Sequence, residues 1–558
     1  MRNKEVSKIL SNIARFLAMD NVAFKPQAYE RAALGIESME EDIENLYSEK
    51  KLKTIPGVGE GIAKAIEEYL KTGTIRIYEE YKKKLPIDLD ALTALEGLGA
   101  KRARVLYQKL KIRSIKDLER AAKNHKIAPV FGFGEKTEKN ILEGIQFLKR
   151  DKGRFLLGDI MPTVKDVFDR LASLKEVKKI SLAGSLRRMK ETIGDGDILI
   201  VSTFPSKVVN AFINFPGVEK VWAKGSTKAS VRMKEGFDID LRIVPAKSYG
   251  SALQYFTGSK DHNIRTRLRA MEKGLKLNEY GVFRGSKMIA GRTEKEVYSA
   301  IGLPFIPPEL REDHGELNFP LPSLVEMKDI KGDLHCHSDW DGGSDSIKDM
   351  ASYADSLGYE YLGIADHTKF LRIEHGLDEK QLLKQREAVK KITSFKVIQG
   401  CETNILTNGT CDIKDSVLSQ LDYVIAGVHS QMKMTKEEMT DRIIRAMKNP
   451  HIDIIAHPTG RLIQRRDEFL LDFDKILRAA KETGTILEIN SNPLRLDLKD
   501  VNIRRAREAG VKMVINTDSH QKEQMELMEY GVAQARRGWA EKKDIVNTYS
   551  LNKLLECL

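Results

Sequence analysis

The chain of 558 residues is poor in cysteine, with only Cys336, Cys401, Cys411 and Cys557, and no two of them form a CxxC pair. This scarcity argues against a disulfide framework and predicts a reduced, cytoplasmic compartment. Long apolar runs are also missing: no window reaches ~18 apolar residues, so we expect no membrane-spanning helix. The first twenty residues have the pattern of an amphipathic helix and lack the apolar centre of a signal peptide.

Acidic residues are outnumbered, with 81 Asp and Glu against 93 Lys and Arg, which gives a net charge of +12. This excess predicts a polyanionic partner, nucleic acid before membrane, although charge alone is equally compatible with an ordinary basic enzyme. Hydrophobic and charged contents of 41% and 31% are those of a soluble globular protein. The length exceeds what a single core supports, so about three or more domains are expected.

Proline is sparse except in one segment, where five of the sixteen prolines lie between Pro304 and Pro322. This concentration predicts a linker or domain boundary near residues 304–331. Before it, residues 155–250 alternate helical and strand patterns, and residues 251–318 mix the two. After it, short apolar runs alternate with helical patterns to the end, which is typical of parallel βα units.

The first 150 residues have the pattern of short helices separated by glycine turns, of which three resemble one another. The glycine pairs of these turns are Gly57 and Gly59, Gly97 and Gly99, and Gly132 and Gly134. Each turn precedes a helical pattern, so its backbone N–H groups can hold an anion. The turns resemble helix-hairpin-helix motifs, which grip DNA phosphates without reading sequence. A single such turn is more often a plain helix connection, but three in a basic protein favour DNA binding.

One segment carries the strongest chemical signal. A turn containing Gly184, Ser185 and Arg188 is followed by Asp195 and Asp197, which begin a buried strand pattern. Residues two apart on a strand share a face, so both carboxylates can converge on the same divalent cations. Phosphoryl transfer needs that arrangement, because its catalysis is mostly positioning and charge neutralisation.

A third carboxylate is expected from the strand pattern of residues 237–244, in which apolar and polar residues alternate strictly. Asp238, Asp240 and Arg242 therefore share one face. Such a face is compatible with a plain polar surface, but next to Asp195 and Asp197 it favours a two-metal site. One ion would activate a 3′-hydroxyl and the other would hold the triphosphate, with Asp240 beside the hydroxyl.

These motifs, with Tyr255-Phe256-Thr257-Gly258-Ser259 and Asn278-Glu279-Tyr280, resemble the family X DNA polymerases over residues 1 to about 318. The resemblance implies DNA polymerisation with two Mg²⁺ ions at Asp195, Asp197 and Asp240. It also implies binding sites for a deoxynucleoside triphosphate and for gapped or primed DNA. The implied nucleotide contacts are Gly184, Ser185, Arg188, Tyr255, Phe256, Gly258 and Asn263, and Arg267 is implied to contact the template strand.

The resemblance departs from the family pattern at one position. Family members with 5′-deoxyribose-phosphate lyase activity carry a Schiff-base lysine where this chain has Ala65, and the adjacent Lys64 would face about 100° away on a helix. Lys25, Tyr29 and Lys53 match the family's 5′-phosphate pocket. We therefore expect 5′-phosphate binding with weak or absent lyase activity.

Beyond the linker, apolar runs repeatedly end in metal-ligating residues. Seven strand-like runs occur, and six of them end in His, Asp or Glu. A single such histidine is usually structural, but this repetition predicts the mouth of a (β/α) barrel. The runs resemble the PHP (polymerase and histidinol phosphatase) domain, a distorted (β/α)7 barrel holding up to three metal ions. Its implied ligands here are His335, His337, His367, Glu402, His429, His457, Asp518 and His520.

The ninth ligand of that family is an Asp, and the ungapped position here is Gly342. We expect Asp341 to serve from one residue earlier. Arg461 and His375 are candidates for phosphate binding, although surface or loop roles are as compatible with the sequence. A mixed His and carboxylate cluster suits Zn²⁺ or Mn²⁺ better than Mg²⁺ alone.

The sequence thus predicts a multidomain α+β and α/β protein. The expected regions are a helical DNA-binding domain (1–84), a helix-hairpin-helix subdomain (85–150), a nucleotidyltransferase palm (151–250), a thumb-like α+β subdomain selecting the nucleotide (251–318), a linker (319–331) and the PHP barrel (332–558).

The predicted function is gap-filling DNA polymerisation in repair, with the PHP domain acting as a 3′-5′ exonuclease or 3′-end phosphoesterase, in a monomer without membrane partners. The alternatives are a PHP domain that is only structural, a non-catalytic repair scaffold, and a nucleotidyltransferase acting on RNA or small molecules.

Overall fold

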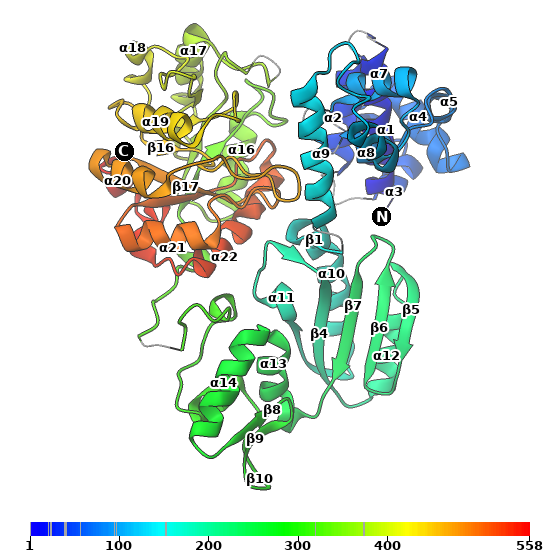
Figure 1. The fold of residues 1–558 in the computed structure, drawn as a ribbon, viewed down its shortest axis with the longest axis vertical. Helices are drawn as coiled ribbons and strands as arrows, with labels where there is room; N and C mark the ends of the chain where they lie inside the picture. The colour runs from blue at the N-terminus through cyan, green and yellow to red at the C-terminus, as the bar shows by residue number, and fades with distance from the viewer. Residues whose placement is uncertain are drawn as a thin grey trace. The chain divides into compact units, whose positions relative to one another are not determined.

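The computed structural model divides the chain into two compact units, residues 1–152 with 464–466, and residues 153–463 with 467–558. It describes residues 2–20, 22, 25–37, 42–55, 57–93, 95, 98–150, 153–317, 320–371 and 374–558. Figure 1 shows the helices and strands of each unit. Within the ranges given, no helix is both long and apolar enough to cross a membrane.

The described part of the first unit is helical. Its helices are α1 (Asn3–Met19), α2 (Lys25–Glu37), α3 (Ile43–Ser48), α4 (Glu60–Thr72), α5 (Arg76–Lys84), α6 (Leu89–Thr93), α7 (Ala100–Leu110), α8 (Ile115–Lys123) and α9 (Glu135–Arg150). One core gathers the apolar faces of α1 to α4, including Leu10 and Ile66. A second core joins α6 to α9 around Leu106 and Leu118. The short helices of the sequence prediction are therefore present in the described part of this unit.

A five-stranded mixed sheet lies at the centre of residues 153–243, here called the palm region. Its strands are β2 (Val177–Ala183), β4 (Asp195–Ser202), β5 (Val218–Lys224), β6 (Lys228–Met233) and β7 (Asp238–Ile243), in the order β2-β4-β7-β6-β5. β1 (Phe155–Leu156) and β3 (Thr192–Ile193) form a separate small ladder. β4 is parallel to β7, and the other neighbours in the sheet are antiparallel.

The palm sheet buries one face beneath helices α10 (Leu157–Ala172) and α12 (Pro205–Ile213), whose apolar residues share a core with the strands. Along β7, buried and partly exposed residues alternate, as the sequence pattern predicts. The buried residues are Ile239, Leu241 and Ile243, which leaves Asp238 and Asp240 on the opposite face. The one-turn helix α11 (Gly184–Arg187) follows β2 directly.

Residues 249–317, here called the thumb region, follow the palm sheet. They comprise α13 (Tyr249–Thr257), α14 (Lys260–Glu272), β8 (Lys276–Asn278), β9 (Gly281–Arg284), β10 (Lys287–Ala290) and α15 (Glu294–Ala300). The three strands form an antiparallel sheet in the order β10-β9-β8. Helix α13 ends at Gly258, which has a φ of +71°, and Ser259 caps α14 through its side chain. This break turns residues 255–263 toward the palm carboxylates.

Residues 332–558, here called the C-terminal region, contain short parallel strands alternating with helices, as predicted. The strands are β11 (Gly332–Cys336), β12 (Tyr361–Ile364), β13 (Val397–Gln399), β14 (Glu402–Asn404), β15 (Ile425–Gly427), β16 (Ile454–Ile455), β17 (Ile486–Asn490) and β18 (Met513–Asn516). The helices of eight or more residues are α16 (Ile347–Ser356), α17 (Glu379–Val389), α19 (Lys436–Met447), α20 (Phe473–Thr483), α21 (Asp500–Ala509) and α22 (Met528–Arg537).

The strands of the C-terminal region form two parallel sheets, β11-β12-β13 and β14-β15-β16-β17-β18. Residues 397–402 form one strand-like run in the sequence but two strands in the structure, because β13 pairs with β12 whereas β14 pairs with β15. A parallel bridge between Cys336 and Ser519 links the first sheet to the end of β18. A closed seven-stranded barrel stays a prediction, which this link supports.

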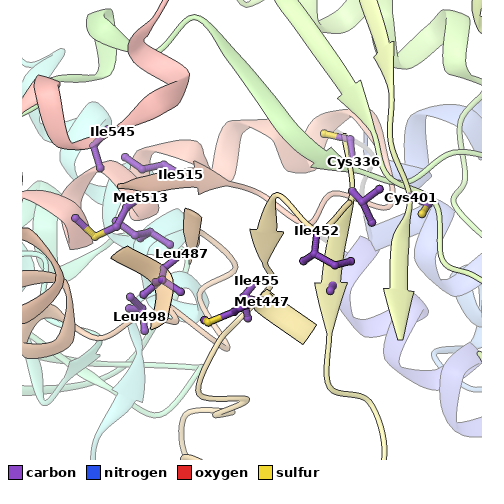
Figure 2. Packing of buried hydrophobic residues seen from close by; sticks show 14 of the residues in the cluster. Cys336, Cys401, Met447, Ile452, Ile455, Leu487, Leu498, Met513, Ile515 and Ile545 are labelled. Atoms are coloured by element: carbon purple, nitrogen blue, oxygen red, sulfur yellow. The ribbon is translucent and has the colours of Figure 1, made fainter. Parts of the chain in front are cut away.

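Both faces of these strands are buried, as in other parallel sheets. A large cluster packs strands against helices, and Figure 2 shows part of it around Leu487, Met513 and Ile515. A second cluster takes alternate residues of the same strands, including Ile486 and Val514. Polar residues also lie inside these strands: Asp333 of β11 and Glu488 of β17 are both fully buried.

The C-terminal region also completes the cores of the palm and thumb regions. Leu496 and Tyr530 are buried in the palm cluster with residues of α10 and β4. Trp539 is buried in the thumb cluster with residues of α14 and α15. These shared cores explain why residues 153–463 and 467–558 form one compact unit.

Candidate active sites

The palm carboxylates meet because β4 and β7 are parallel neighbours. Their register pairs Asp195 with Asp238 and Asp197 with Asp240, so the three predicted catalytic residues lie on adjacent strands. Burial and then the charge of Asp240 raise the pKa of Asp195. Burial followed by the charges of Asp195 and Asp240 raises the pKa of Asp197 to about 7. Carboxylates that disfavour one another's charge in this way are suited to share divalent cations.

The turn after β2 brings the backbone against this cluster. Gly184 has a φ of +60°, and a Cβ atom there would lie 2.2 Å from Oδ2 of Asp197. Only glycine fits both the left-handed conformation and the close approach. Ser185 follows in α11 and is partly buried. The turn is therefore shaped around Asp197, as its position ahead of the carboxylates in the sequence suggests.

A cavity of about 300 Å³ opens beside Asp197. Its lining is Arg188, Asp197, Tyr255, Phe256, Gly258, Ser259, Lys260, Asn263 and Arg267. The structure thus brings together most of the predicted nucleotide contacts and the predicted template contact. Gly184, Ser185, Asp195 and Asp240 are outside this lining. Ser259 and Lys260 line the cavity but were not predicted as contacts, although their position after Gly258 at the start of a helical pattern was visible in the sequence.

The thumb side of the cavity is held by polar contacts. The Nδ2 of Asn263 donates to the carbonyl of Tyr255 at 2.7 Å, and its Oδ1 accepts from Gln254 at 2.8 Å. Arg267 donates from Nε to the carbonyl of Asn263 at 3.1 Å. The guanidinium of Arg242 lies 4.5 Å from the ring centre of Phe256. These contacts fix residues 255–263 as a rigid wall.

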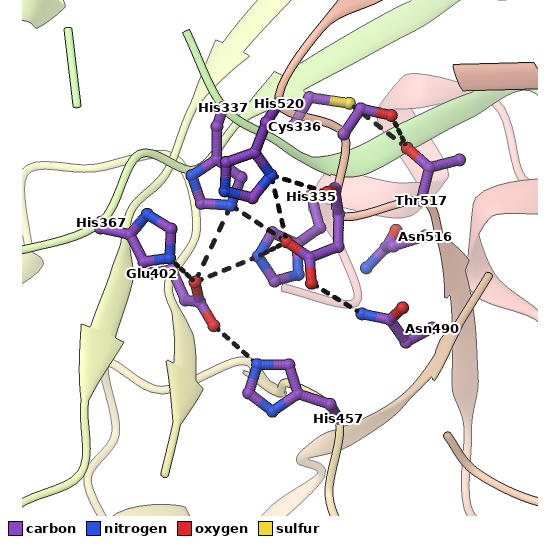
Figure 3. A network of polar contacts seen from close by, with 12 residues as sticks. His335, Cys336, His337, His367, Glu402, His457, Asn490, Asn516, Thr517 and His520 are labelled. Atoms are coloured by element: carbon purple, nitrogen blue, oxygen red, sulfur yellow. Dashed lines mark hydrogen bonds and ion pairs between the residues drawn. The ribbon is translucent and has the colours of Figure 1, made fainter. Parts of the chain in front are cut away.

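The predicted metal ligands of the C-terminal region converge in one cluster (Figure 3). The histidines and Asp518 lie near or after the carboxyl ends of their strands, whereas Glu402 is the first residue of β14. Glu402 is central: its Oε1 lies 3.1 Å from Nε2 of His429 and 3.0 Å from Nε2 of His457. Its Oε2 lies 3.0 Å from Nε2 of His367 and 3.4 Å from Nε2 of His335. Burial alone would raise the pKa of Glu402, but these histidines hold it well below its usual range.

Asp518 faces the other side of the cluster, with Oδ1 3.3 Å from Nε2 of His337. Three overlapping sets have ligand atoms within 4.8 Å of one another: His335, His337 and Asp518; His337, His367 and His520; and His367, Glu402 and His429. Among the residues that the structure describes, the buried Nε2 atoms of His335 and His337 make no hydrogen bond, although Oε2 of Glu402 and Oδ1 of Asp518 lie 3.4 and 3.3 Å from them. A buried polar atom without a partner is costly, so these donors fit metal ions.

A second layer of carboxylates orients the histidines. Glu488 lies 2.7 Å from Nδ1 of His335, and Oδ2 of Asp341 lies 2.7 and 2.8 Å from Nδ1 of His337 and His367. Contact at Nδ1 directs the opposite nitrogen into the cluster and raises its basicity as a ligand. Asp341, the expected ninth ligand, thus contacts two predicted ligands from behind, and direct ligation by it stays a prediction.

Two acidic residues of this layer were missed from the sequence. Glu488 lies on β17, the run that does not end in His, Asp or Glu, and the signal was a lone carboxylate among the apolar residues of that run. Asp366 forms a further set with His337 and Asp341, and burial followed by the charge of Asp341 raises its pKa to about 7. Arg461, a candidate for phosphate binding, instead pairs with Glu191 of the palm region at 2.7 Å.

The predicted DNA-binding turns lie at helix starts in the first unit. Gly59 caps α4, Gly99 caps α7, and Gly134 immediately precedes α9. Gly57 has a φ of +78°, and a Cβ atom there would lie 2.8 Å from the backbone nitrogen of Ala32.

The other residues of this unit that are predicted to contact DNA differ in backbone conformation and in exposure. Gly132 has a φ of +85°, and Gly97 lies outside the described residues. Lys25 and Lys53 are exposed, and Tyr29 is partly buried. Basic side chains and backbone N–H groups are therefore available to phosphates in this unit.

The position at which lyase-active family members carry a Schiff-base lysine is held here by Ala65, as the sequence indicates. Ala65 is buried in the core of the first unit, with 7% of its surface exposed. Lys64 lies on the exposed side of α4 and pairs with Glu60 at 3.3 Å. Neither residue places an amine at the expected buried position.

The chain matches known family models in four regions. They are a helix-hairpin-helix domain (residues 1–75), a SAM-like helix-hairpin-helix tandem (89–146), the DNA polymerase beta thumb (252–312) and the PHP domain (333–492). The DNA polymerase/3′-5′ exonuclease PolX of Bacillus subtilis is 36% identical over 99% of this chain and 98% of that protein. Probable phosphatases of Acetivibrio thermocellus and Clostridium acetobutylicum are each 31% identical over 34% of this chain and 78% of their own lengths.

Proposed function

Because the chain belongs to the family of the bacterial DNA polymerase/3′-5′ exonuclease PolX, we propose that it fills short gaps in DNA and also shortens DNA 3′ ends. The observation that supports the polymerase assignment most directly is the parallel register of β4 and β7. It pairs Asp240 with Asp197, which lies two residues after Asp195 on β4. The family models for helix-hairpin-helix and thumb domains support DNA as the acceptor and a deoxynucleoside triphosphate as the donor.

In the palm region, Asp195, Asp197 and Asp240 would hold two Mg²⁺ ions, which neutralise charge on the attacking and leaving oxygens when bound. Asp240 would lie beside the primer 3′-hydroxyl and accept its proton. Arg188 and Ser185 would bind the triphosphate, and the rigid wall of residues 255–263 would orient the sugar and base. Positioning of this kind supplies much of the rate enhancement of phosphoryl transfer.

The His and carboxylate donors of the C-terminal region fit Zn²⁺ or Mn²⁺, up to three ions. Such ions supply a nucleophilic water at neutral pH for phosphoester cleavage. Each carboxylate oxygen of Glu402 would act beside a different group of histidines, while Glu488 and Asp341 hold the imidazoles in place. A 3′-5′ exonuclease or 3′-end phosphoesterase is the matching reaction, with the 3′ end of the DNA as its substrate.

We further propose that the first unit binds DNA phosphates, including a 5′-phosphate near Lys25, Tyr29 and Lys53, with weak or absent lyase activity. The buried methyl group of Ala65 supports this, because it leaves no amine at the family's Schiff-base position. Borohydride reduction on abasic DNA should yield no Lys-linked adduct. Efficient trapping, at the rate of a lysine-bearing family member, would contradict the proposal.

A single assay tests both active sites. A 5′-labelled gapped DNA is incubated with Mg²⁺ or Mn²⁺, with and without nucleotides, for wild type, Asp240→Ala and His335→Ala. Asp240→Ala should stop primer extension and retain 3′-end shortening, and His335→Ala should show the reverse.

The two variants control for each other, and His451→Ala provides a matched histidine before β16, outside the cluster. Extension by Asp240→Ala would refute the polymerase assignment. Undiminished shortening by His335→Ala would show that the metal cluster is only structural.

A further inference from the structure

The guanidinium of Arg188, on the wall of the palm cavity, is held in place by two acceptors. Its Nε donates to Oε1 of Glu312 at 3.0 Å, and its Nη1 donates to the carbonyl of Thr257. An arginine has five N–H donors in a rigid fork, so most remain for another ligand. The residues with described positions contribute no acceptor to Nη2 of Arg188, and the side chain lines the cavity.

Glu312 in turn is held from the C-terminal region. Arg537, the last residue of α22, donates from Nη1 to Oε1 of Glu312 at 3.1 Å and to the carbonyl of Arg188 at 2.9 Å. Its Nη2 donates to Asp500 at 2.5 Å, and only 1% of the Arg537 side chain is exposed. Arg537 therefore contacts both the backbone of Arg188 and the carboxylate that orients its side chain.

The charges in this network favour an ionised Glu312. Burial alone would raise its pKa, but Arg188, Arg537 and Lys190 hold it below its usual range. Side-chain exposures of 12% for Arg188 and 14% for Glu312 keep water from replacing these bonds. Charge-assisted hydrogen bonds in such surroundings are strong and directional.

We propose that Arg537 and Glu312 are positioning residues for the nucleotide: the C-terminal region holds Arg188 in the orientation that binds the triphosphate. The proposal rests on the assignment of Arg188 to triphosphate binding. It makes the region with the His and carboxylate cluster a part of the polymerase site, independent of any hydrolysis that the cluster performs.

The chain offers a matched control on the same helix. Arg536 donates to Glu309 at 2.7 Å and to the carbonyl of Val325 at 3.0 Å, so it also connects α22 to the thumb region. Its partners thus differ from those of its neighbour Arg537, which contacts both Arg188 and Glu312. Arg536→Met therefore removes a comparable link and leaves the hydrogen bonds of the proposed network in place.

The experiment is single-nucleotide insertion into one-nucleotide-gapped DNA by the full-length chain. KM for the nucleotide and kcat are measured for Glu312→Ala, Arg537→Met, Arg536→Met and Arg188→Ala, beside 3′-end shortening without nucleotides. Glu312→Ala and Arg537→Met should raise KM about tenfold with little change in kcat, because ground-state and transition-state binding of the triphosphate weaken together. Arg536→Met should leave KM unchanged, and none should alter 3′-end shortening.

The outcomes separate this proposal from the polymerase assignment. If Arg188→Ala leaves KM unchanged, the triphosphate assignment fails. If Arg188→Ala raises KM but Glu312→Ala does not, only the positioning role fails. If Glu312→Ala instead lowered KM, Glu312 would be masking Arg188 from the triphosphate, which also overturns the proposal. Should Arg537→Met not fold, Glu312→Gln, which keeps an acceptor but removes the charge, must still raise KM about threefold.

Discussion

Replacing Gly184 by alanine is expected to disable the polymerase site and to leave the His and carboxylate cluster of the C-terminal region unchanged. The new Cβ atom would lie 2.2 Å from Oδ2 of Asp197, against 3.4 Å for an ordinary contact. The carboxylate must therefore move by about 1.2 Å, and misplacement of ~1 Å in a catalytic group can lower the rate about 100-fold. That loss corresponds to about 2.7 kcal/mol of transition-state stabilisation. The left-handed φ of +60° adds about 1–2 kcal/mol of strain for alanine.

The assay is primer extension on gapped DNA with Mg²⁺, beside 3′-end shortening and thermal unfolding. Gly194→Ala is the matched control, since a Cβ atom there meets only Arg154 at 3.8 Å and no positive φ is needed. Gly184→Ala should lose about 100-fold in extension and retain 3′-end shortening, whereas Gly194→Ala should behave as wild type. Equal extension by both variants would refute the geometric argument for the turn.

Other perturbations test the cores and the metal cluster. Leu496→Ala removes a buried side chain of the palm core and should lower the free energy of unfolding by about 2–5 kcal/mol. Both activities should then be lost at a lower temperature than in wild type. Primer extension that persists to the wild-type temperature would contradict the shared core. Glu138→Gln should destabilise the first unit by about 1–3 kcal/mol. Burial opposes ionisation of Glu138, but the N–H of Ala128 and the ring of His125 hold its pKa below 4.5, so wild type should lose this stabilisation as the pH falls below 4.5. A thermal unfolding midpoint of the first unit that is the same at pH 7 and pH 3.5 would contradict this contribution of Glu138. Chelation should lower the thermal midpoint of wild type more than that of His335→Ala, and calorimetry showing equal shifts would argue against metal at this cluster.

The palm site was predictable because its information is local. Strict alternation along residues 238–243 fixes which side chains share a face, and the structure has that alternation. The spacing of Asp195 and Asp197 places both on one strand face in the same way. What the sequence could not give is the parallel pairing of β4 with β7, which sets Asp197 beside Asp240. That pairing depends on tertiary packing.

The C-terminal cluster was predictable for its histidines and less so for their surroundings. Ligands at strand ends follow from the βα pattern, and these residues do converge. Glu488 contacts His335 across 153 positions of sequence, so no local pattern reveals the pair. Similarly, Glu312 and Arg537 are 225 positions apart, and each alone has the pattern of a surface charge. The run at residues 397–402 divides into two strands because its halves pair with different neighbours.

The burial of Leu496 and Tyr530 among palm residues has a consequence for synthesis on the ribosome. The last palm strand ends at Ile243, yet the core beneath it stays incomplete until Tyr530 has been made, 287 residues later. At elongation rates of about 5–20 residues per second this delay is about 15–60 s. During that interval the apolar face of the palm sheet lacks part of its cover, which exposes it to chaperones and to aggregation. Truncation before Leu496 would therefore release an insoluble polymerase fragment, even though Asp195, Asp197 and Asp240 were all present.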